Sequence, residues 1–199
     1  MMVPANPSLT ELAGLLPLDG AADRTAVLAI DGPSGSGKST LAGRLTSTFR
    51  ATGRSVALVH MDDLCPGWDG LGRAPAKLLT WVLEPLSRND AARYRRFDWM
   101  ADRFAEWHQL PQADLVIIEG VGAGAAVVAP HLDLLLWIEA PLTLRFERGI
   151  ARDGDAYRPQ WERWARQEVV MFAQEGTRER AAVILDGSRA IPDEPRQTR

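Results

Sequence analysis

The stretch DGPSGSGKST, residues 31–40, constrains the fold of this 199-residue chain more than any other part of its sequence. Residues 32–39 have the spacing G-x-x-x-x-G-K-[ST]. The apolar run TAVLAID precedes them, and apolar residues at a spacing of four follow. Because this pattern belongs between a strand and a helix, it predicts a strand that ends at Asp31 and a helix that begins near Lys38.

A loop of this composition is suited to binding the phosphates of a nucleoside triphosphate. Its glycines allow backbone N–H groups to turn toward phosphate oxygens, and the following helix adds the positive end of its dipole. We expect Lys38 to reach the terminal phosphates and Ser39 to offer its hydroxyl to Mg²⁺. A glycine-rich turn that merely carries a lysine is the alternative, and the flanking strand and helix argue against it. The expected cofactors are ATP and Mg²⁺, and the expected nucleotide-binding residues are Gly32, Pro33, Ser34, Gly35, Ser36, Gly37, Lys38, Ser39 and Thr40.

Five short apolar runs, each ending at an acidic residue or a glycine, alternate with helical patterns along the chain. Near-continuous apolar runs are typical of strands that are buried on both faces. Strands that alternate with helices indicate a parallel sheet with helices on both faces. The sequence therefore predicts a three-layer α/β fold around a mostly parallel five-stranded sheet. The runs are residues 25–31, 55–62, 113–120, 132–140 and 181–187.

The length and composition indicate one domain over residues 1–199, with its core at about 25–187. An S-x-x-E capping-box spacing predicts a short N-terminal helix over 8–16. The last residues, 188–199, are polar and contain prolines, so they are expected to form a tail.

Charge and cysteine content restrict the possible partners. A formal net charge of -3 gives no general attraction to nucleic acid or to anionic membranes. No apolar run is long enough to span a membrane, and the N-terminus lacks the pattern of a signal peptide. A single cysteine, Cys65, fits a reducing compartment. We expect a cytoplasmic protein that binds neither nucleic acid nor membranes. Its three histidines are scattered along the sequence and are not expected to form a zinc site. The sequence does not determine the number of subunits.

Acidic residues follow the second and third predicted strands, at the edge of the sheet where open parallel sheets bind ligands. We expect Asp62 to accept a proton from an acceptor hydroxyl, and Asp63 to lie on the acceptor side of the site. Glu119 is expected to reach the metal ion or its water. For each acid, the alternative is a strand-end residue without a chemical role.

Three arginines after the fourth predicted strand have the spacing of one helix face. Arg145, Arg148 and Arg152 are three and four residues apart. They are expected to cover the phosphates, where their charge would stabilise a transferred phosphoryl group. A solvated charged face is the alternative. The expected catalytic residues are Lys38, Asp62, Arg148 and Arg152.

Two tryptophans, Trp68 and Trp99, lie in loop-like stretches near the predicted cleft. An aromatic wall there would suit a flat or apolar acceptor. Trp164 and three other tryptophans have helical or strand spacing and are expected in the core. The acceptor pocket is expected between residues 62–70 and 94–103. Its predicted residues are Asp62, Asp63, Trp68, Phe97, Asp98, Trp99 and Arg103.

With IDGPSGSGKST, VHMDDL, YRRFDW, IIEG and RGIARDG in this order, the chain resembles the uridine kinase-like branch of small-molecule P-loop kinases over about residues 25–187. The resemblance implies a P-loop NTPase fold of the nucleoside monophosphate kinase and uridine kinase type. In that family an aspartate after the second strand is the base on the sugar hydroxyl, and it matches Asp62. The family's magnesium-holding glutamate matches Glu119, and its lid arginine matches Arg152.

The family's YDF segment, which lines the nucleoside pocket, is here FDW, residues 97–99. Asp102 stands about where the family has a histidine. This exchange replaces a hydrogen-bond donor by an acceptor, so the preferred acceptor is expected to carry an N–H or O–H where uracil has a carbonyl.

These observations lead to three hypotheses. The first is ATP-dependent phosphoryl transfer to a hydroxyl of a small molecule, which is nucleoside-like by resemblance. The second is a nucleoside monophosphate kinase, in which arginines between 88 and 103 bind the acceptor's phosphate. The third is a nucleotide-hydrolysing switch or binding protein, which ranks last because no N-K-x-D-like stretch for guanine follows a strand.

Overall fold

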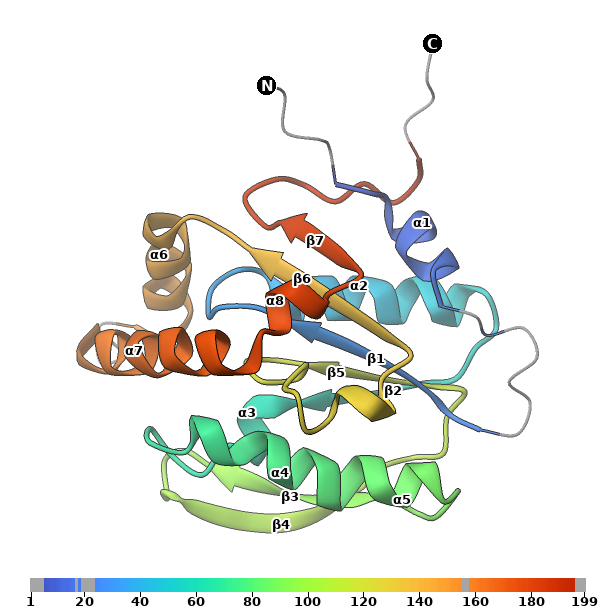
Figure 1. Cartoon of the computed structure of the whole chain (residues 1–199), viewed down its shortest axis with the longest axis horizontal. Helices are drawn as coiled ribbons and strands as arrows, with labels where there is room; N and C mark the ends of the chain where they lie inside the picture. Colours follow the sequence, from blue (N-terminus) through green and yellow to red (C-terminus); the bar gives the residue numbers. More distant parts are fainter. Residues whose placement is uncertain (1–5, 17, 19–23, 155–157, 196–199) are drawn as a thin grey trace.

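The computed structural model describes residues 6–16, 18, 24–154 and 158–195. A five-stranded, all-parallel sheet in the order β2-β5-β1-β6-β7 forms its centre (Figure 1). All five predicted strands are confirmed. They are β1 (Ala26–Asp31), β2 (Val56–His60), β5 (Leu115–Glu119), β6 (Leu134–Glu139) and β7 (Val183–Asp186).

Helices cover both faces of the sheet, which explains why the strands are apolar throughout. On one face, Leu28 and Ile30 of β1 pack with α1 (Leu9–Gly14) and α2 (Lys38–Ala51). On the other face, Val27 and Ala29 pack with a second set of helices. That set includes α4 (Ala74–Leu78), the π-helical turn η2 (Leu79–Leu83) and α7 (Arg158–Glu175). Shorter elements complete the chain: α3 (Met61–Leu64), η1 (Leu71–Arg73), α5 (Glu84–Ser87), η3 (Ala129–His131), α6 (Leu142–Asp153) and α8 (Thr177–Arg180).

The predicted N-terminal helix begins with the expected capping box. The Ser8 backbone N–H donates to Glu11 Oε2 at 2.7 Å, and the Glu11 N–H donates to Ser8 Oγ at 3.1 Å. The described part of the predicted tail packs against this helix, since the Leu9 N–H donates to the Pro192 carbonyl at 2.8 Å. Residues 196–199 of the tail lie outside the described residues. Among the described residues, no helix has the length and apolar character needed to cross a membrane.

The helical run from Ala74 to Ser87 continues through Pro85 instead of ending there. Pro75 occupies the first turn, where its missing N–H costs no helical hydrogen bond. Pro85 lacks an N–H and cannot make the i→i−4 bond of an α-helix. The wider turn of η2 directly precedes α5, and Pro85 lies in the first turn of α5. The buried side chains of Val82 and Leu83 hold this run against the core.

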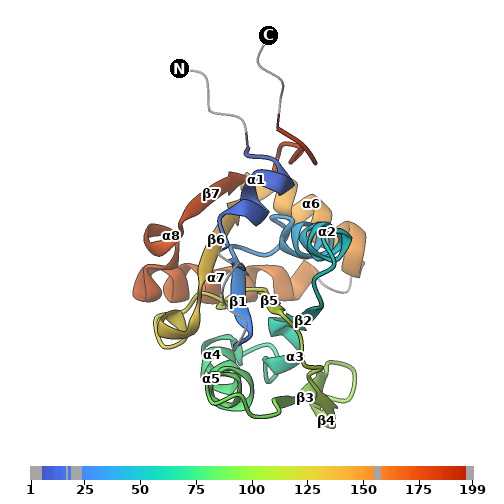
Figure 2. The same cartoon turned by 90° about the vertical axis from the view of Figure 1, so that its right-hand side faces the viewer.

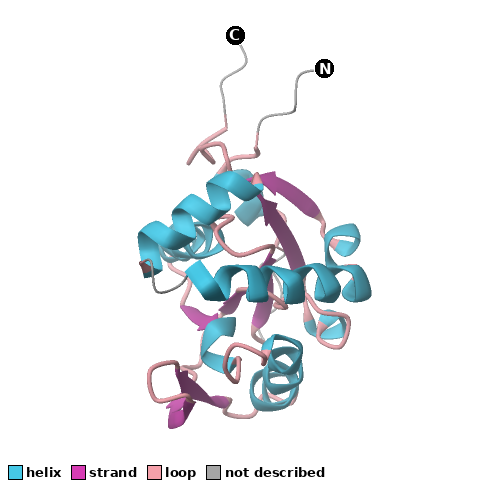
Figure 3. Ribbon diagram, turned by 90° about the vertical axis from the view of Figure 1, so that its left-hand side faces the viewer, coloured by secondary structure: helices cyan, strands magenta, loops and turns pink. Residues whose placement is uncertain are grey.

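A separate antiparallel hairpin, β3 (Arg93–Asp98) and β4 (Arg103–Gln109), was not predicted. It pairs Phe97 with Phe104 and Asp98 with Arg103, with an irregular register between Arg95 and Phe97. Figure 3 shows it apart from the main sheet, and in Figure 2 it lies at the opposite end of the molecule from α1. The hairpin packs on α3, the short helix after β2.

A buried carboxylate joins the start of the phosphate-binding loop to the turn after β5. Asp31, at the end of β1, accepts backbone N–H groups from Gly32 at 2.7 Å, Gly122 at 3.1 Å and Gly124 at 2.9 Å. Burial raises the pKa of Asp31 to about 6. The side chain is therefore ionised above pH 7, the form that accepts all three hydrogen bonds.

We expect Asp31→Asn to lower the free energy of unfolding by about 1–3 kcal/mol, because it leaves at least one buried N–H without an acceptor. Urea unfolding at pH 7.5 measures the change. The control is Asp90→Asn, which removes an exposed pair with Arg88 and should cost less than about 1 kcal/mol. Equal stability of the two variants would contradict the role given to Asp31.

Candidate active site

A cleft of about 370 Å³ lies beside the phosphate-binding loop, at the edge where the strands of the sheet end. The loop and the first turn of α2 form one side of it. Asp62 of α3, Glu119 of β5 and Arg148 and Arg152 of α6 line the rest. The structure therefore brings together the residues that the sequence analysis placed at this edge.

The loop closes tightly under α6. Gly35 has a φ of 77°, and a Cβ atom at this position would lie 2.3 Å from the carbonyl oxygen of Arg145. Only glycine meets both conditions without strain. Lys38 folds back over the loop, and its Nζ donates to the carbonyl oxygens of Gly32 at 2.8 Å and Pro33 at 3.1 Å. Its ammonium group is thus held at the loop, where terminal phosphates would bind.

Ser39 and Glu119 form a set of oxygen atoms suited to Mg²⁺. Ser39 Oγ donates to Glu119 Oε1 at 3.0 Å. Burial opposes the ionisation of Glu119, but the hydrogen bond with His60 and the charge of Lys38 outweigh it and lower the pKa of Glu119. An ionised carboxylate beside a hydroxyl at the end of a phosphate loop fits this ion.

His60 is a site residue that the sequence analysis missed. Its Nδ1 lies 2.6 Å from Glu119 Oε1, and this hydrogen bond raises the pKa of His60. The sequence contained the information needed to find this pair, because His60 ends β2 and Glu119 ends β5. Adjacent parallel strands place these two residues side by side in register. A search for metal-ligand spacing along the chain does not find such a pair.

The adjacent carboxylates of α3 point to different neighbours. Asp62 lines the cleft, where burial between its walls and the charge of Glu119 raise its pKa. Asp62 is nevertheless an exposed residue by its accessible surface, so the effect of burial on its pKa is limited by contact with solvent. Asp63 instead makes a hydrogen bond with Tyr94 of the hairpin, whose pKa burial raises to about 12. Only Asp62 therefore lies beside the phosphate loop.

The three arginines of α6 all lie on its phosphate-loop side. Arg145 donates to the carbonyl oxygen of Ser34 at 3.2 Å, and Arg148 donates to that of Gly187 at 3.0 Å. Arg152 lines the cleft and is paired with Asp153 at 2.8 Å. Figure 1 shows α6 and α7 together at the edge where β1 and β6 end.

A second pocket, of about 330 Å³, continues from the phosphate loop on the other side of Arg148. Gly37 and Thr40 contribute to it, together with residues 187–191 after β7. The sequence analysis did not assign this segment to the site, although it follows the last strand at the same edge. Its position beside the loop suits the base and sugar of a nucleotide.

Aromatic rings gather between the loop at residues 65–70, which we call the acceptor loop, and the turn of the hairpin. Trp68 and Trp99 lie 4.9 Å apart between ring centroids, and Phe97 lies 5.4 Å from Trp99. Trp164 is buried as predicted, and it also contacts Trp68 at 5.9 Å. Trp99 is tied to the cleft, because its Nε1 donates to the Asp62 carbonyl at 3.2 Å.

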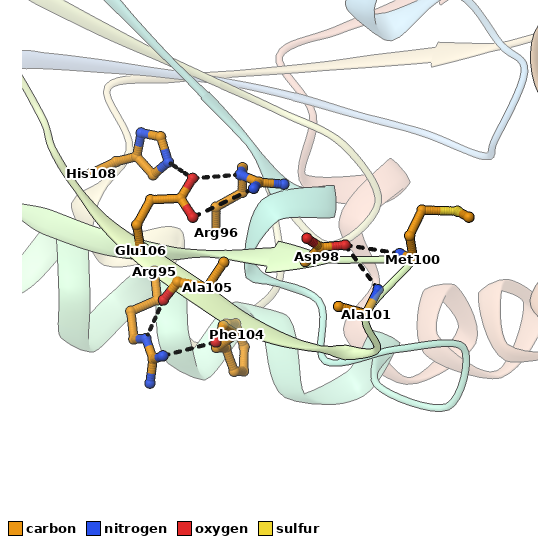
Figure 4. A network of polar contacts seen from close by, with 9 residues as sticks. All are labelled: Arg95, Arg96, Asp98, Met100, Ala101, Phe104, Ala105, Glu106 and His108. Carbon is orange, nitrogen blue, oxygen red and sulfur yellow. Dashed lines mark hydrogen bonds and ion pairs between the residues drawn. The ribbon is translucent and has the colours of Figure 1, made fainter.

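The other predicted acceptor residues lie around the hairpin turn. Asp98 accepts the backbone N–H groups of Met100 at 3.0 Å and Ala101 at 2.9 Å, as Figure 4 shows. Asp102 has a φ of 49° and lies beside Gly67 of the acceptor loop. Arg103 is exposed at the start of β4.

Arginines of the hairpin are bonded within it. Arg95 donates to the carbonyl oxygens of Ala105 at 2.9 Å and Phe104 at 2.8 Å (Figure 4). Arg96 donates to Glu106 at 2.9 Å, and this hydrogen bond lowers the pKa of Glu106 to about 2. The guanidinium groups of Arg95 and Arg96 thus stabilise the hairpin.

Solved structures of several kinases share this fold. A possible uridine kinase from Bacillus stearothermophilus matches with a TM-score of 0.67 and 23% identity, over 89% of this chain and 97% of that one. A putative fructose transport system kinase from Silicibacter sp. TM1040 matches with a TM-score of 0.62 and 22% identity, over 89% of this chain and 98% of that one. D-glycerate 3-kinase from Cryptococcus neoformans var. grubii matches with a TM-score of 0.62 and 14% identity, over 92% of this chain and 97% of that one. No protein-family model and no curated protein sequence matches the chain. The chain thus has the P-loop kinase fold that its motifs predicted.

We expect Gly35→Ala to weaken binding of Mg²⁺–ADP about tenfold or more, because the added methyl group strains a left-handed residue and displaces Arg145. Calorimetric titration measures the affinity. The matched control is Gly43→Ala on α2, where a Cβ meets nothing within 4 Å. This control should bind ADP normally. Unchanged binding by Gly35→Ala would contradict the tight closure of α6 on the loop.

Proposed function

We propose that this protein transfers the γ-phosphoryl group of ATP to a hydroxyl of a small, nucleoside-like molecule. One observation carries the proposal: the carboxylate of Asp62 lies in the same cleft as Lys38 and the Ser39–Glu119 pair. A phosphate loop alone is shared by switches, hydrolases and kinases. A carboxylate positioned beside it supplies the base that transfer to a hydroxyl requires.

In the proposed reaction, Asp62 accepts the proton of the acceptor hydroxyl while the oxygen of that hydroxyl forms a bond to the γ-phosphorus. The bond between that phosphorus and the β–γ bridging oxygen breaks, and ADP leaves with the electron pair. Lys38 neutralises charge on the β- and γ-phosphates, and Arg148 and Arg152 face the same cleft. Ser39 and Glu119 would hold Mg²⁺, which supplies further charge neutralisation when bound.

The environment of Asp62 supports its role as the base. Burial and the nearby charge of Glu119 raise its pKa, and a base of raised pKa accepts a proton more readily. Asp62 also belongs to the same short helix as Met61 and Leu64, which are fully buried. The carboxylate is therefore carried by a fixed element.

Four of the five arginines between residues 88 and 103 have other partners, which favours a hydroxyl acceptor over an acceptor that already carries a phosphate; the fifth, Arg103, is exposed at the start of β4. A nucleoside monophosphate kinase needs cations directed at the acceptor's phosphate. Here Arg95 is bound to carbonyl oxygens and Arg96 to Glu106. Arg88 pairs with Asp90, and Arg93 lies 4.8 Å from the ring of Trp107.

The aromatic wall of Trp68, Trp99 and Phe97 supports a flat acceptor such as a nucleoside. The names of the three structural neighbours refer to uridine, to fructose transport and to D-glycerate. These molecules share hydroxyl groups and little else. The common fold therefore supports the reaction more strongly than the identity of the acceptor.

An acceptor screen tests the proposed function. ADP release from Mg²⁺–ATP is measured with and without nucleosides, nucleoside monophosphates, sugars and small hydroxy acids. We expect a nucleoside to stimulate release strongly, and an amino- or hydroxyl-bearing base to exceed uracil. Lys38→Ala is the control and should abolish the stimulation. Stimulation by monophosphates alone would contradict the proposal, and so would hydrolysis that no acceptor increases.

We expect Asp62→Asn to lower kcat by about 10²-fold or more while nucleotide affinity stays within about twofold, since a general base contributes about 10²–10⁴. The wild-type rate should fall as the pH drops through the raised pKa of Asp62, and the variant should lose this dependence. Asp63→Asn is the matched control and should lower kcat less than tenfold, because Asp63 faces Tyr94. A larger effect of the Asp63 change would assign the base to the neighbouring residue.

A further inference from the structure

Helix α7 lies between the phosphate loop and the acceptor loop and is bonded to both. Its residues Arg163, Trp164, Gln167 and Glu168 have the i, i+1, i+4, i+5 spacing of one helix face. They span about 7.5 Å along the helix axis, at a rise of about 1.5 Å per residue. Trp164 and Glu168 contact the phosphate loop, and Arg163, Gln167 and the ring of Trp164 contact the acceptor loop. This short face is therefore a direct mechanical connection between the two loops.

On the phosphate loop, α6 and α7 bind every polar group of Ser34. Its backbone N–H donates to Glu168 Oε1 at 2.9 Å, and its Oγ accepts from Trp164 Nε1 at 3.0 Å. Arg145 donates to its carbonyl oxygen at 3.2 Å and lies 3.6 Å from the second oxygen of Glu168. Glu168 is only 3% exposed. Its buried charge needs these partners, so a displacement of α7 also displaces Ser34.

On the acceptor loop, the same face of α7 holds Trp68 and Asp69. Gln167 Nε2 donates to the Trp68 carbonyl at 2.7 Å, and Arg163 forms an ion pair with Asp69. The ring of Trp164 lies 5.9 Å from that of Trp68 and 6.0 Å from that of Trp99. The side chain of Trp164 thus contacts the rings of Trp68 and Trp99 and, through its N–H, the phosphate loop.

We propose that Trp164, supported by Glu168, is a positioning residue that couples the two substrate subsites, so that contact of an acceptor with the aromatic cluster around Trp68 changes the affinity of the phosphate loop for nucleotide. Close-packed interiors transmit displacement because they hold few voids. Coupling between two binding sites is reciprocal in free energy, so the nucleotide changes acceptor affinity by the same factor. The inference rests on the proposed function, because it needs both subsites.

The test measures nucleotide binding alone and requires no knowledge of the acceptor. The affinity for a non-hydrolysable ATP analogue with Mg²⁺ is determined by calorimetry for the wild type and for Trp68→Leu. Trp68 lies outside the described residues that line the nucleotide cleft. The matched control is Trp107→Leu. Trp107 of β4 is 47% exposed, and its ring packs on that of Trp81 in η2. Both substitutions are repeated in a Trp164→Phe background, which keeps the ring contact and removes the N–H donor.

We expect Trp68→Leu to weaken analogue binding about fivefold or more in the wild type, which is the lower end of measured couplings between sites. The effect should fall below twofold in the Trp164→Phe background, and Trp107→Leu should have no effect in either. Thermal unfolding verifies that each variant is folded. Gln167→Leu replaces Trp68→Leu if that variant does not fold; it removes the hydrogen bond to the Trp68 carbonyl and a longer one, of 3.4 Å, to the Arg163 carbonyl within α7.

Two results would overturn the inference while leaving the proposed function intact. One is a Trp68→Leu affinity that matches that of Trp107→Leu. The other is an equal loss of affinity with and without the Trp164 N–H, which would exclude Trp164 as the link. A wild type that does not bind the analogue overturns both proposals.

Discussion

The carboxylate of Asp31 is the interaction on which the arrangement of the site depends. Buried at the end of the central strand, it accepts N–H groups from the first residue of the phosphate loop and from the turn after β5. The three backbone donors that converge on it belong to Gly32, Gly122 and Gly124. One side chain therefore fixes two chain segments that are about ninety residues apart.

The register of the parallel strands determines which residues lie next to one another at the ends of the neighbouring strands. β5 lies between β1 and β2, so Glu119 at its end lies in register with His60 of β2 and with Ile30, the residue before Asp31. Both Ser39 and His60 form a hydrogen bond with Glu119 Oε1. The ionised state of Glu119 follows from these neighbours, which overcome the cost of its burial. The Ser39–Glu119 pair that we propose as the cation site thus results from strand register together with the start of α2.

The sequence predicted those parts of the molecule that depend on local pattern. The five strands were visible because both of their faces are covered, and the phosphate loop because its glycines are required by its own geometry. The hairpin was not visible, since its charged residues are satisfied only by partners across the hairpin, such as Arg96 by Glu106. His60 was overlooked because its partner lies 59 residues away. A proline inside a helical pattern favours a kink or a stop, whereas the helical run at Pro85 stays intact and packs against the core.

The clustering of tryptophans around Trp164 has a consequence for spectroscopy. The rings of Trp68, Trp99 and Trp164 are all within 6.0 Å of one another, so light absorbed by one of them is readily passed to the others. One member of the trio is bonded to the phosphate loop and another to the backbone of Asp62. The contribution of this trio to the intrinsic fluorescence is therefore a joint signal from both halves of the cleft. Assigning an emission change to one ligand requires each tryptophan of the trio to be replaced in turn.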